Sequence, residues 1–461
     1  MNWHDVLTAM LPEHILLAGM VLLLCHEIVS GKDRDGFFLG FVTVAAAAIA
    51  ACVLFAQGYA GSPFAGHFSV APETSLPKAA ILGLTLPVLL ISRDDFAESR
   101  YYVLLLASLY GACLLVSSDS FLTLFLGIEL MSLPVYVLVL LAFLRPESTE
   151  AALKYLVLGG AATATLLMGV SLLYGSSGSL GITAFSNALS STQPLAAGGA
   201  VLVVAALMLK AAIVPFHAWA PDAYEGATVP VTAYMATVVK AGILLAVLRI
   251  VGEAPLPGAV VGLIAVLPLI SIVWGNLAAM RQKSFRRMIA YSSIAHAGYL
   301  FYAFLGDGPG RYEAVVFYVV AYGLMNVLAF AAMPAGGEDE SRDPLDTFKG
   351  LFHRDPFGAS MLAIAMLSLA GIPPLPGFVA KFLVFKNVMA AGYTLYAVLG
   401  LVGSYVGIYF YLRVIQFMFM TPAEGHAEPR RARHYAVATC LICLIPALLL
   451  ALFPGAVIGR G

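Results

Sequence analysis

The sequence has few charged residues, and their scarcity excludes an ordinary soluble protein. Charged side chains make up 11% of the 461 residues and hydrophobic ones 61%, whereas soluble domains carry about 25% charged residues. So few charges cannot cover a surface that faces water, and a lipid bilayer must cover it instead. The net charge of −1 leaves no basic field, so no nucleic acid is expected as a partner.

Metal-binding and redox patterns are also scarce. The five cysteines lie in apolar segments, and Cys440 and Cys443 form a lone C-x-x-C in the last of these. A zinc or iron–sulfur site needs further thiolates or histidines, so we interpret both as packing residues. The glycine-rich runs 175–179 and 306–310 lack the strand and helix context of nucleotide-binding loops. We therefore expect no cofactor and no metal in this chain.

The sequence does contain many long apolar runs, and they predict an all-α, polytopic membrane protein. A helix needs about 20 mostly apolar residues to cross about 30 Å of hydrocarbon. The first run follows a segment without Lys or Arg, so we expect a retained helix rather than a signal peptide. Fourteen runs qualify as spans: 13–30, 36–57, 77–92, 101–117, 121–143, 151–174, 195–220, 227–250, 256–274, 287–305, 311–333, 357–390, 394–420 and 434–457.

Two of these spans contain prolines that predict broken helices. Pro215 lies in the seventh span, and Pro373, Pro374 and Pro376 lie in the twelfth. Proline removes a helix donor and clashes with the preceding turn, and broken helices persist at membrane depth where they line a cavity. The breaks are five helices apart, an odd number, which indicates two inverted five-helix repeats. We expect one membrane domain, 1–461, divided as follows: helices 1–3 in 1–100, a first five-helix unit in 101–250, a second in 256–420, and a C-terminal helix in 434–457.

Basic residues concentrate in alternate loops, which predicts the topology. Cytoplasmic loops are enriched in Lys and Arg, so both termini should lie on the periplasmic side of a bacterial inner (plasma) membrane. The connection 221–226 contributes no Lys or Arg. The loop 336–354 opens with an acidic run and is expected to be mobile. The predicted cytoplasmic set is Lys32, Arg34, Arg93, Arg100, Arg145, Arg281, Lys283, Arg286, Arg287, Arg342, Lys349, Arg354, Arg430, Arg431 and Arg433; Arg249, Arg311 and Arg460 lie opposite.

Four ionisable residues lie deep in spans or beside breaks: Glu129, Lys210, Lys240 and Lys381. Each costs about 2.5–3.5 kcal/mol to insert on translocon scales, so each needs a partner or a function. A buried lysine loses its proton more easily than a solvated one, which makes proton loading and release possible. The alternatives are a structural ion pair for Glu129, a snorkelling Lys210 and a cavity-lining Lys381.

Histidines and hydroxyls between these residues extend the candidate proton path. His217 follows Pro215 by two residues, and His296 lies in the tenth span. Histidine transfers protons near neutral pH, although a lone histidine is more often a packing residue. Lys154, near the start of the sixth span, is either a relay or a boundary charge. Three hydroxyl residues could hold water in the path: Tyr224, Ser292 and Ser293.

Several motifs together resemble the antiporter-like subunits of proton-translocating NADH:quinone oxidoreductase (respiratory complex I). That family also includes subunits of multisubunit cation/proton antiporters. The likeness runs from about 121 to 420. Within it, the run 215–226 (PFHAWAPDAYEG) and a lysine rather than a glutamate at Lys381 fit the subunit N group. The matching motifs are GIELMSLP (127–134), ALKYLVLG (152–159), VPFHAWAPD (214–222), GNLAAMRQ (275–282), RMIAYSSIAHAGY (287–299) and GIPPLPGF (371–378).

The resemblance implies fourteen helices with a hydrated polar axis and a role in proton translocation. It assigns seven residues to that axis: Glu129, Lys154, Lys210, His217, Lys240, His296 and Lys381. It also implies membrane-arm and peripheral-arm partner subunits that carry the redox chemistry of NADH, FMN, iron–sulfur clusters and quinone. Three alternatives remain: a cation/proton antiporter subunit, a membrane subunit of a related hydrogenase, and a structural subunit without its own proton path.

Overall fold

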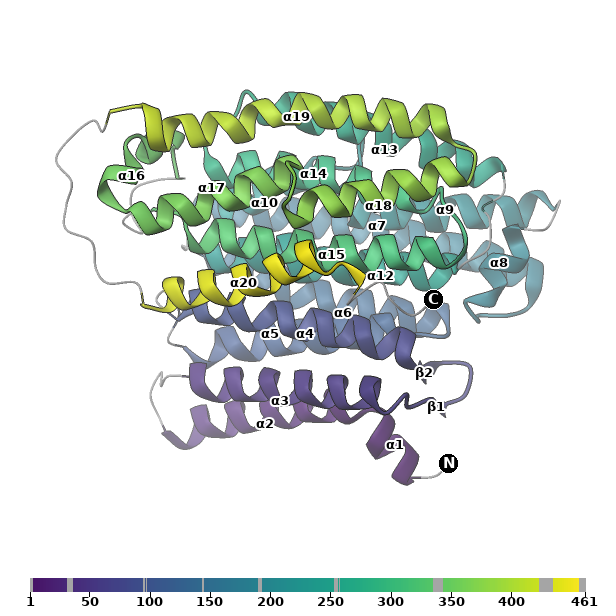
Figure 1. Ribbon diagram of the computed structural model, residues 1–461. Coiled ribbons are helices and arrows are strands. Elements are labelled where there is room, and N and C mark those ends of the chain that lie inside the picture. Colours follow the sequence, from purple (N-terminus) through teal and green to yellow (C-terminus); the bar gives the residue numbers. More distant parts are fainter. Residues whose placement is uncertain are drawn as a thin grey trace. The chain divides into compact units, whose positions relative to one another are not determined.

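Long apolar helices make up nearly all of the protein, as the fourteen runs predict (Figure 1). The computed structural model describes residues 3–30, 36–93, 96, 98–142, 145–189, 193–252, 256, 258–334, 343–422 and 434–455. Seven predicted loop cations lie outside these ranges: Lys32, Arg34, Arg342, Arg430, Arg431, Arg433 and Arg460. The acidic start of the 336–354 loop also lies outside them.

Eleven helices of the described part are long and apolar enough to cross a membrane. The other three predicted spans correspond to one unbroken helix and to two helices that are broken in the middle. The spans predicted at 195–220 and 357–390 are each interrupted near their prolines. The all-α prediction and the two broken helices are therefore confirmed.

The chain divides into two compact units, which are described separately. The first contains residues 1–211 and 238–261. Its elements are α1 (Trp3–Ala9), α2 (Leu11–Ser30), α3 (Phe37–Ala56), β1 (Gly61–Phe64), β2 (Phe68–Val70), α4 (Pro72–Ser92), α5 (Ser99–Val116), α6 (Phe121–Leu140), α7 (Pro146–Ser177), α8 (Thr183–Leu189), α9 (Pro194–Lys210) and α12 (Lys240–Val251).

The second unit contains residues 212–237 and 262–461. This division follows compactness and leaves the predicted repeat boundaries untested. Its elements are α10 (Trp219–Gly226), α11 (Val229–Tyr234), most of the π-helical turn η1 (Met235–Val239), most of α13 (Gly258–Ala279), α14 (Phe285–Ala303), α15 (Gly308–Ala331), the 3₁₀ turn η2 (Leu345–Phe348), α16 (Leu351–Arg354), α17 (Pro356–Ala370), α18 (Pro376–Ala390), α19 (Thr394–Met420) and α20 (His434–Leu452).

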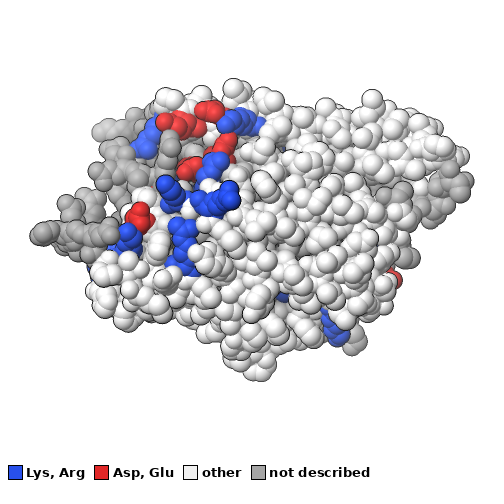
Figure 2. All heavy atoms as spheres, turned by 90° about the horizontal axis from the view of Figure 1, so that it is seen from above, with Lys and Arg blue, Asp and Glu red and all other residues white. Residues whose placement is uncertain are grey.

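Large apolar side chains are exposed along the helices, as lipid contact requires. On α19, for example, Val402, Tyr405 and Tyr409 are each more than half exposed. The face drawn in Figure 2 is mostly uncharged, and most of its Lys, Arg, Asp and Glu side chains gather in one part of it. An apolar surface of this extent is typical of a protein that contacts lipid or other membrane subunits.

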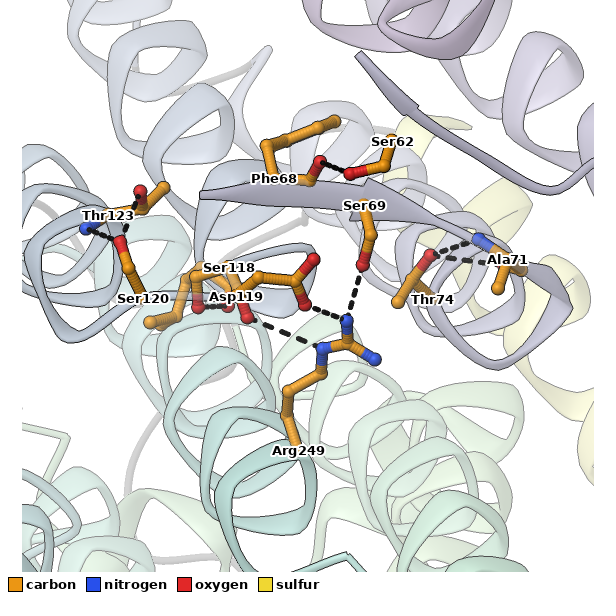
Figure 3. A network of polar contacts seen from close by, with 11 residues as sticks. Ser62, Phe68, Ser69, Ala71, Thr74, Ser118, Asp119, Ser120, Thr123 and Arg249 are labelled. Carbon is orange, nitrogen blue, oxygen red and sulfur yellow. Dashed lines mark hydrogen bonds and ion pairs between the residues drawn. The ribbon is translucent and has the colours of Figure 1, made fainter. Parts of the chain in front are cut away.

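In the first unit, three of the loops predicted to lie outside the cytoplasm are joined by one cation. Arg249, at the end of α12, forms an ion pair with Asp119 of the α5–α6 connection. Its guanidinium also donates to the Ser69 hydroxyl of β2 (2.5 Å) and to the Ser118 carbonyl (3.4 Å) (Figure 3). These contacts place the β1–β2 hairpin, the α5–α6 connection and the end of α12 at one end of the unit, as the alternating topology requires.

In the second unit, loops predicted to be cytoplasmic are joined in the same way. Arg286, in the first turn of α14, pairs with Asp343 and donates to the Ala227 carbonyl. Burial raises the pKa of the Asp343 carboxyl, and the adjacent Arg286 opposes that rise. The loops before α11, α14 and α16 therefore meet at one end of this unit.

The topology can be tested by cysteine labelling in a background without the five native cysteines. Thr347 and Ser179 are both exposed and lie in loops of opposite predicted side. A membrane-impermeant maleimide should label Ser179→Cys in right-side-out vesicles and Thr347→Cys in inverted ones, because alternating loops face opposite compartments. Labelling of both positions from the same side would rule out the fourteen-span topology.

Candidate functional site

The first helix break ends α9 at Lys210 and delays the next helix until Trp219. Residues 211–218 form turns, and Ala212 has a left-handed φ of 62°, which a non-glycine residue rarely adopts. Pro215 supplies no backbone donor at this point. The Val214 amide donates to the Ser271 hydroxyl (2.8 Å), so a side chain satisfies a backbone group that the break leaves free.

Lys210 is paired with Glu129, and both belong to the first unit. The Lys210 ammonium lies 3.2 Å from the Glu129 carboxylate and 3.4 Å from the Tyr136 hydroxyl. Glu129 also accepts a 2.5 Å hydrogen bond from Thr163 of α7. The pair is largely buried, with 6% of the Lys210 side chain and 22% of the Glu129 side chain exposed. The snorkelling interpretation of Lys210 does not fit this geometry.

Lys154 lies elsewhere on α7 and is partly exposed. Its ammonium pairs with Glu150 one turn earlier, at 2.6 Å, and 44% of its side chain is exposed. Thr163, the α7 residue that contacts Glu129, is nine residues further along the helix, about 13.5 Å at 1.5 Å per residue. The described contacts of Lys154 therefore do not join it to the Glu129–Lys210 pair.

Lys240 is buried and follows an irregular turn. It is the first residue of α12 and directly follows the π-helical turn η1, and only 7% of it is exposed. π-helical turns inside longer helices occur frequently at functional sites. In the first unit α12 packs against α5, and Gly242 meets Met131 of α6 closely.

The second helix break supplies the acceptors for Lys381. Helix α17 ends at Ala370, which leaves its last carbonyls without intrahelical partners. The Lys381 ammonium donates to the Leu369 carbonyl (3.1 Å), the Ala370 carbonyl (2.9 Å) and the Ser404 hydroxyl (2.9 Å). Three donors therefore meet three acceptors, two of them at the negative end of a helix dipole.

Gly371 permits this approach. Its φ of 87° is left-handed, and a Cβ there would lie 3.0 Å from the Lys381 side chain. Both facts favour glycine at this position. The glycine before the three prolines is therefore part of the lysine's binding site.

His296 stands at the centre of a tyrosine network in the second unit. Its Nδ1 lies 2.8 Å from the Tyr318 hydroxyl and its Nε2 lies 3.0 Å from the Tyr411 hydroxyl. Tyr411 in turn lies 2.5 Å from the Ser292 hydroxyl. Tyr299, one turn along α14 from His296, lies under the Lys381 ammonium, 5.0 Å from its ring centroid. His296 also contacts Tyr299, with 5.6 Å between the ring centroids, so one tyrosine contacts both His296 and Lys381.

His217 lies apart from that network. Its Nε2 accepts a hydrogen bond from the Trp274 indole (3.0 Å), and its ring lies 6.4 Å from that of Tyr291. Its Nδ1 is buried and has no hydrogen-bond partner among the residues described. The contacts are compatible with either a relay or a packing role.

The sequence interpretation missed several groups in these networks. Thr163, Tyr136, Tyr318, Tyr411 and Ser404 all contact the predicted residues but carry no local signal, because their partners are distant in sequence. Cys440 and Cys443 are buried in α20. Within the part of the chain that the structure describes, no group of three or more His, Cys, Asp or Glu residues could hold a metal.

Comparison with known proteins identifies the family. The family model described as "NADH:quinone oxidoreductase/Mrp antiporter, TM" matches residues 118–407. The NADH-quinone oxidoreductase subunit N of Pelobacter propionicus is 40% identical over 457 residues, which cover 97% of this chain and 96% of that protein. The chain belongs to the subunit N family of NADH-quinone oxidoreductases.

Solved structures agree with this membership. A chain of the structure titled "Respiratory complex I from Thermus thermophilus with bound Aureothin" is 34% identical, with a TM-score of 0.83 over 97% of this chain and 98% of that one. A chain of the Mrp complex from Dietzia sp. DQ12-45-1b has a TM-score of 0.85 over 99% of this chain and 96% of that one. At 20% identity, the second likeness shows the fold alone. It therefore gives no support to an antiporter assignment beyond the shared fold.

The Glu129–Lys210 pair allows a test of its structural role. Removing one member leaves a buried charge without its partner, at a cost of about 3–5 kcal/mol, whereas replacing both can be nearly neutral. Glu129→Gln and Lys210→Met should each lower the temperature at which the solubilised complex loses this subunit. The double variant should recover most of the loss.

The exposed Glu150–Lys154 pair is the matched control for stability. Such i,i+4 pairs contribute about 0.3–0.5 kcal/mol, so Glu150→Gln and Lys154→Met should change the dissociation temperature little. Equal effects at both pairs would contradict the burial-based interpretation of Glu129 and Lys210.

Proposed function

We propose that this protein translocates protons as a membrane-arm subunit of NADH:quinone oxidoreductase. The observation that carries the proposal is the repeated pairing of a broken helix with a buried lysine. Lys210 ends the helix before the first break, and Lys381 takes the carbonyls that the second break leaves free. An ionisable residue at membrane depth implies a proton or ion path by default. Membership of the subunit N family makes proton translocation coupled to partner redox chemistry the natural role.

The proposed path uses seven residues with distinct tasks. Glu129 modulates the charge of Lys210 through their ion pair. Lys240 relays protons, and Lys381 passes them toward the far side of the membrane. His296 connects to Lys381 through the tyrosine network, since Tyr299 contacts both of them. His217 and Lys154 are the least supported relays, because their described contacts lie outside the two lysine sites.

The redox chemistry belongs to partner subunits in this proposal. NADH, FMN, iron–sulfur clusters and quinone are expected in those partner subunits. We assign the chain to the bacterial inner membrane, with both termini on the periplasmic side, because the basic loops alternate. A purely structural role is the competing function, since the Glu129–Lys210 pair also holds three helices together.

Lys240 provides the decisive test between these two functions. Lys240→Ala removes the titratable amine, and Lys240→Arg keeps a charge that does not dissociate near neutral pH. Proton pumping driven by NADH oxidation in inverted membranes should fall at least tenfold in both variants, as expected when a positioned proton-transfer group worth about 10²–10⁴-fold is lost. Lys349→Ala, at a cytoplasm-side lysine outside the spans that pairs with Asp346, serves as the control.

Assembly of the complex must be checked in each variant. Rescue by arginine would mean that charge alone matters at this position. Normal pumping in both Lys240 variants, with normal assembly, would leave the structural function as the better account.

A further inference from the structure

A pocket of about 340 Å³ lies at the end of the second unit where the basic loops meet. Its lining residues come from the end of α10, the loop before α14, the first turns of α14 and the loop after α15: Glu225, Arg281, Gln282, Lys283, Ser284, Arg287 and Pro344. None of the seven residues of the proposed path lines it.

Two of the lining residues, Glu225 and Arg287, belong to an ion cluster that also includes Asp222. One guanidinium nitrogen of Arg287 donates both to Asp222 (2.7 Å) and to Glu225 (2.9 Å). Two carboxylates therefore share a single cation. Asp343, the partner of Arg286, also lies within electrostatic range of Glu225. A carboxylate beside a pocket that admits water is a type of group that can take part in proton transfer.

A buried hydroxyl chain leads inward from the cluster. Tyr224, between Asp222 and Glu225 in α10, has its hydroxyl 3.3 Å from that of Ser293 in α14. Both residues are buried. Ser293 is six residues beyond Arg287 on the same helix, about 9 Å inward at 1.5 Å per residue. It is three residues before His296, so their side chains lie on one face of α14.

The buried Tyr322 side chain lies beside both Ser293 and His296. The Tyr322 ring lies 4.8 Å from that of His296. In the described part of the chain, the Tyr322 hydroxyl and the Asn326 amide oxygen are buried without a hydrogen-bond partner. Such groups are normally satisfied by internal water. Water there would connect Ser293 to His296 and so to the network around Lys381.

We propose that Asp222, Glu225 and Arg287 form the mouth through which the second unit takes up protons, and that Tyr224 and Ser293 pass them to His296. The proposal rests on the proton-translocating function proposed above and adds the place of uptake. Glu225 binds a proton from water at its carboxylate, and hydroxyl and water hops carry a proton onward while the carboxylate is regenerated. The mouth opens on the side of the basic loops.

The test compares Glu225→Gln, Glu225→Asp and Tyr224→Phe in inverted membranes, where this side faces the medium. Glu225→Gln and Tyr224→Phe should lower NADH-driven pumping on the order of tenfold at mildly alkaline pH, since a positioned proton-transfer group contributes about 10²–10⁴-fold and Asp222 remains. The loss should shrink as the external pH falls, because a higher proton concentration compensates for slow uptake. Glu225→Asp keeps a carboxylate and should retain most of the activity.

Two control variants separate a proton-transfer role from a structural one. Tyr302→Phe removes a buried hydroxyl that donates to the Ala265 carbonyl, outside the proposed chain, and Asp346→Asn removes an exposed carboxylate on the same side. Both should pump normally at every pH.

The outcomes also separate this proposal from the proposed function. Suppose that assembled Glu225→Gln and Tyr224→Phe complexes pump at the wild-type rate while Lys381→Ala is inactive. That result would reject proton uptake at this cluster and would leave the proposed proton translocation intact. A loss in Glu225→Gln that does not change with pH would assign the cluster a structural role and also overturn the mouth. Normal pumping by Lys381→Ala would remove that lysine from the proposed path.

Discussion

A charged group inside a bilayer must be solvated by the protein itself. The polar contacts described in both units follow from that constraint. Hydrocarbon offers neither hydrogen bonds nor high dielectric, so ionised groups need partners supplied by the protein. Lys210 finds a carboxylate, and Lys381 finds two carbonyls and a hydroxyl. The second helix break serves this need, because it frees backbone carbonyls that an unbroken helix could not offer to Lys381.

The sequence predicted the scaffold well because its signals are local. Apolar runs mark the spans, and prolines lie at both predicted breaks. Proline alone does not mark a break, however, because α6 and α13 continue through Pro134 and Pro268. The charged residues near the breaks stood out because so few charges occur in the spans. The same reasoning failed for the partners. Nothing near Thr163 or Ser404 in the sequence indicates a contact with Glu129 or Lys381.

Two other structural features carry no sequence signal that we could interpret. The π-helical turn before Lys240 arises in the run Met235–Val239, whose composition is that of an ordinary apolar helix. The pair of Glu13 and Lys78 is almost completely buried, with the two charged groups 2.5 Å apart. Each residue lies near the start of its helix, where a charge is unremarkable. Only packing shows that α2 and α4 enclose them together.

The two lysine sites differ in what remains when the lysine is neutral. Loss of a proton from Lys210 leaves the Glu129 carboxylate without its cation, although Thr163 still donates a hydrogen bond to it. The net charge of that site then changes from zero to negative, and the site attracts a proton again. Loss of a proton from Lys381 leaves neutral carbonyls and a hydroxyl, which hold no net charge. The first site therefore recovers its proton by charge attraction, whereas the second depends on the helix-end dipole and on the tyrosine network that leads to His296.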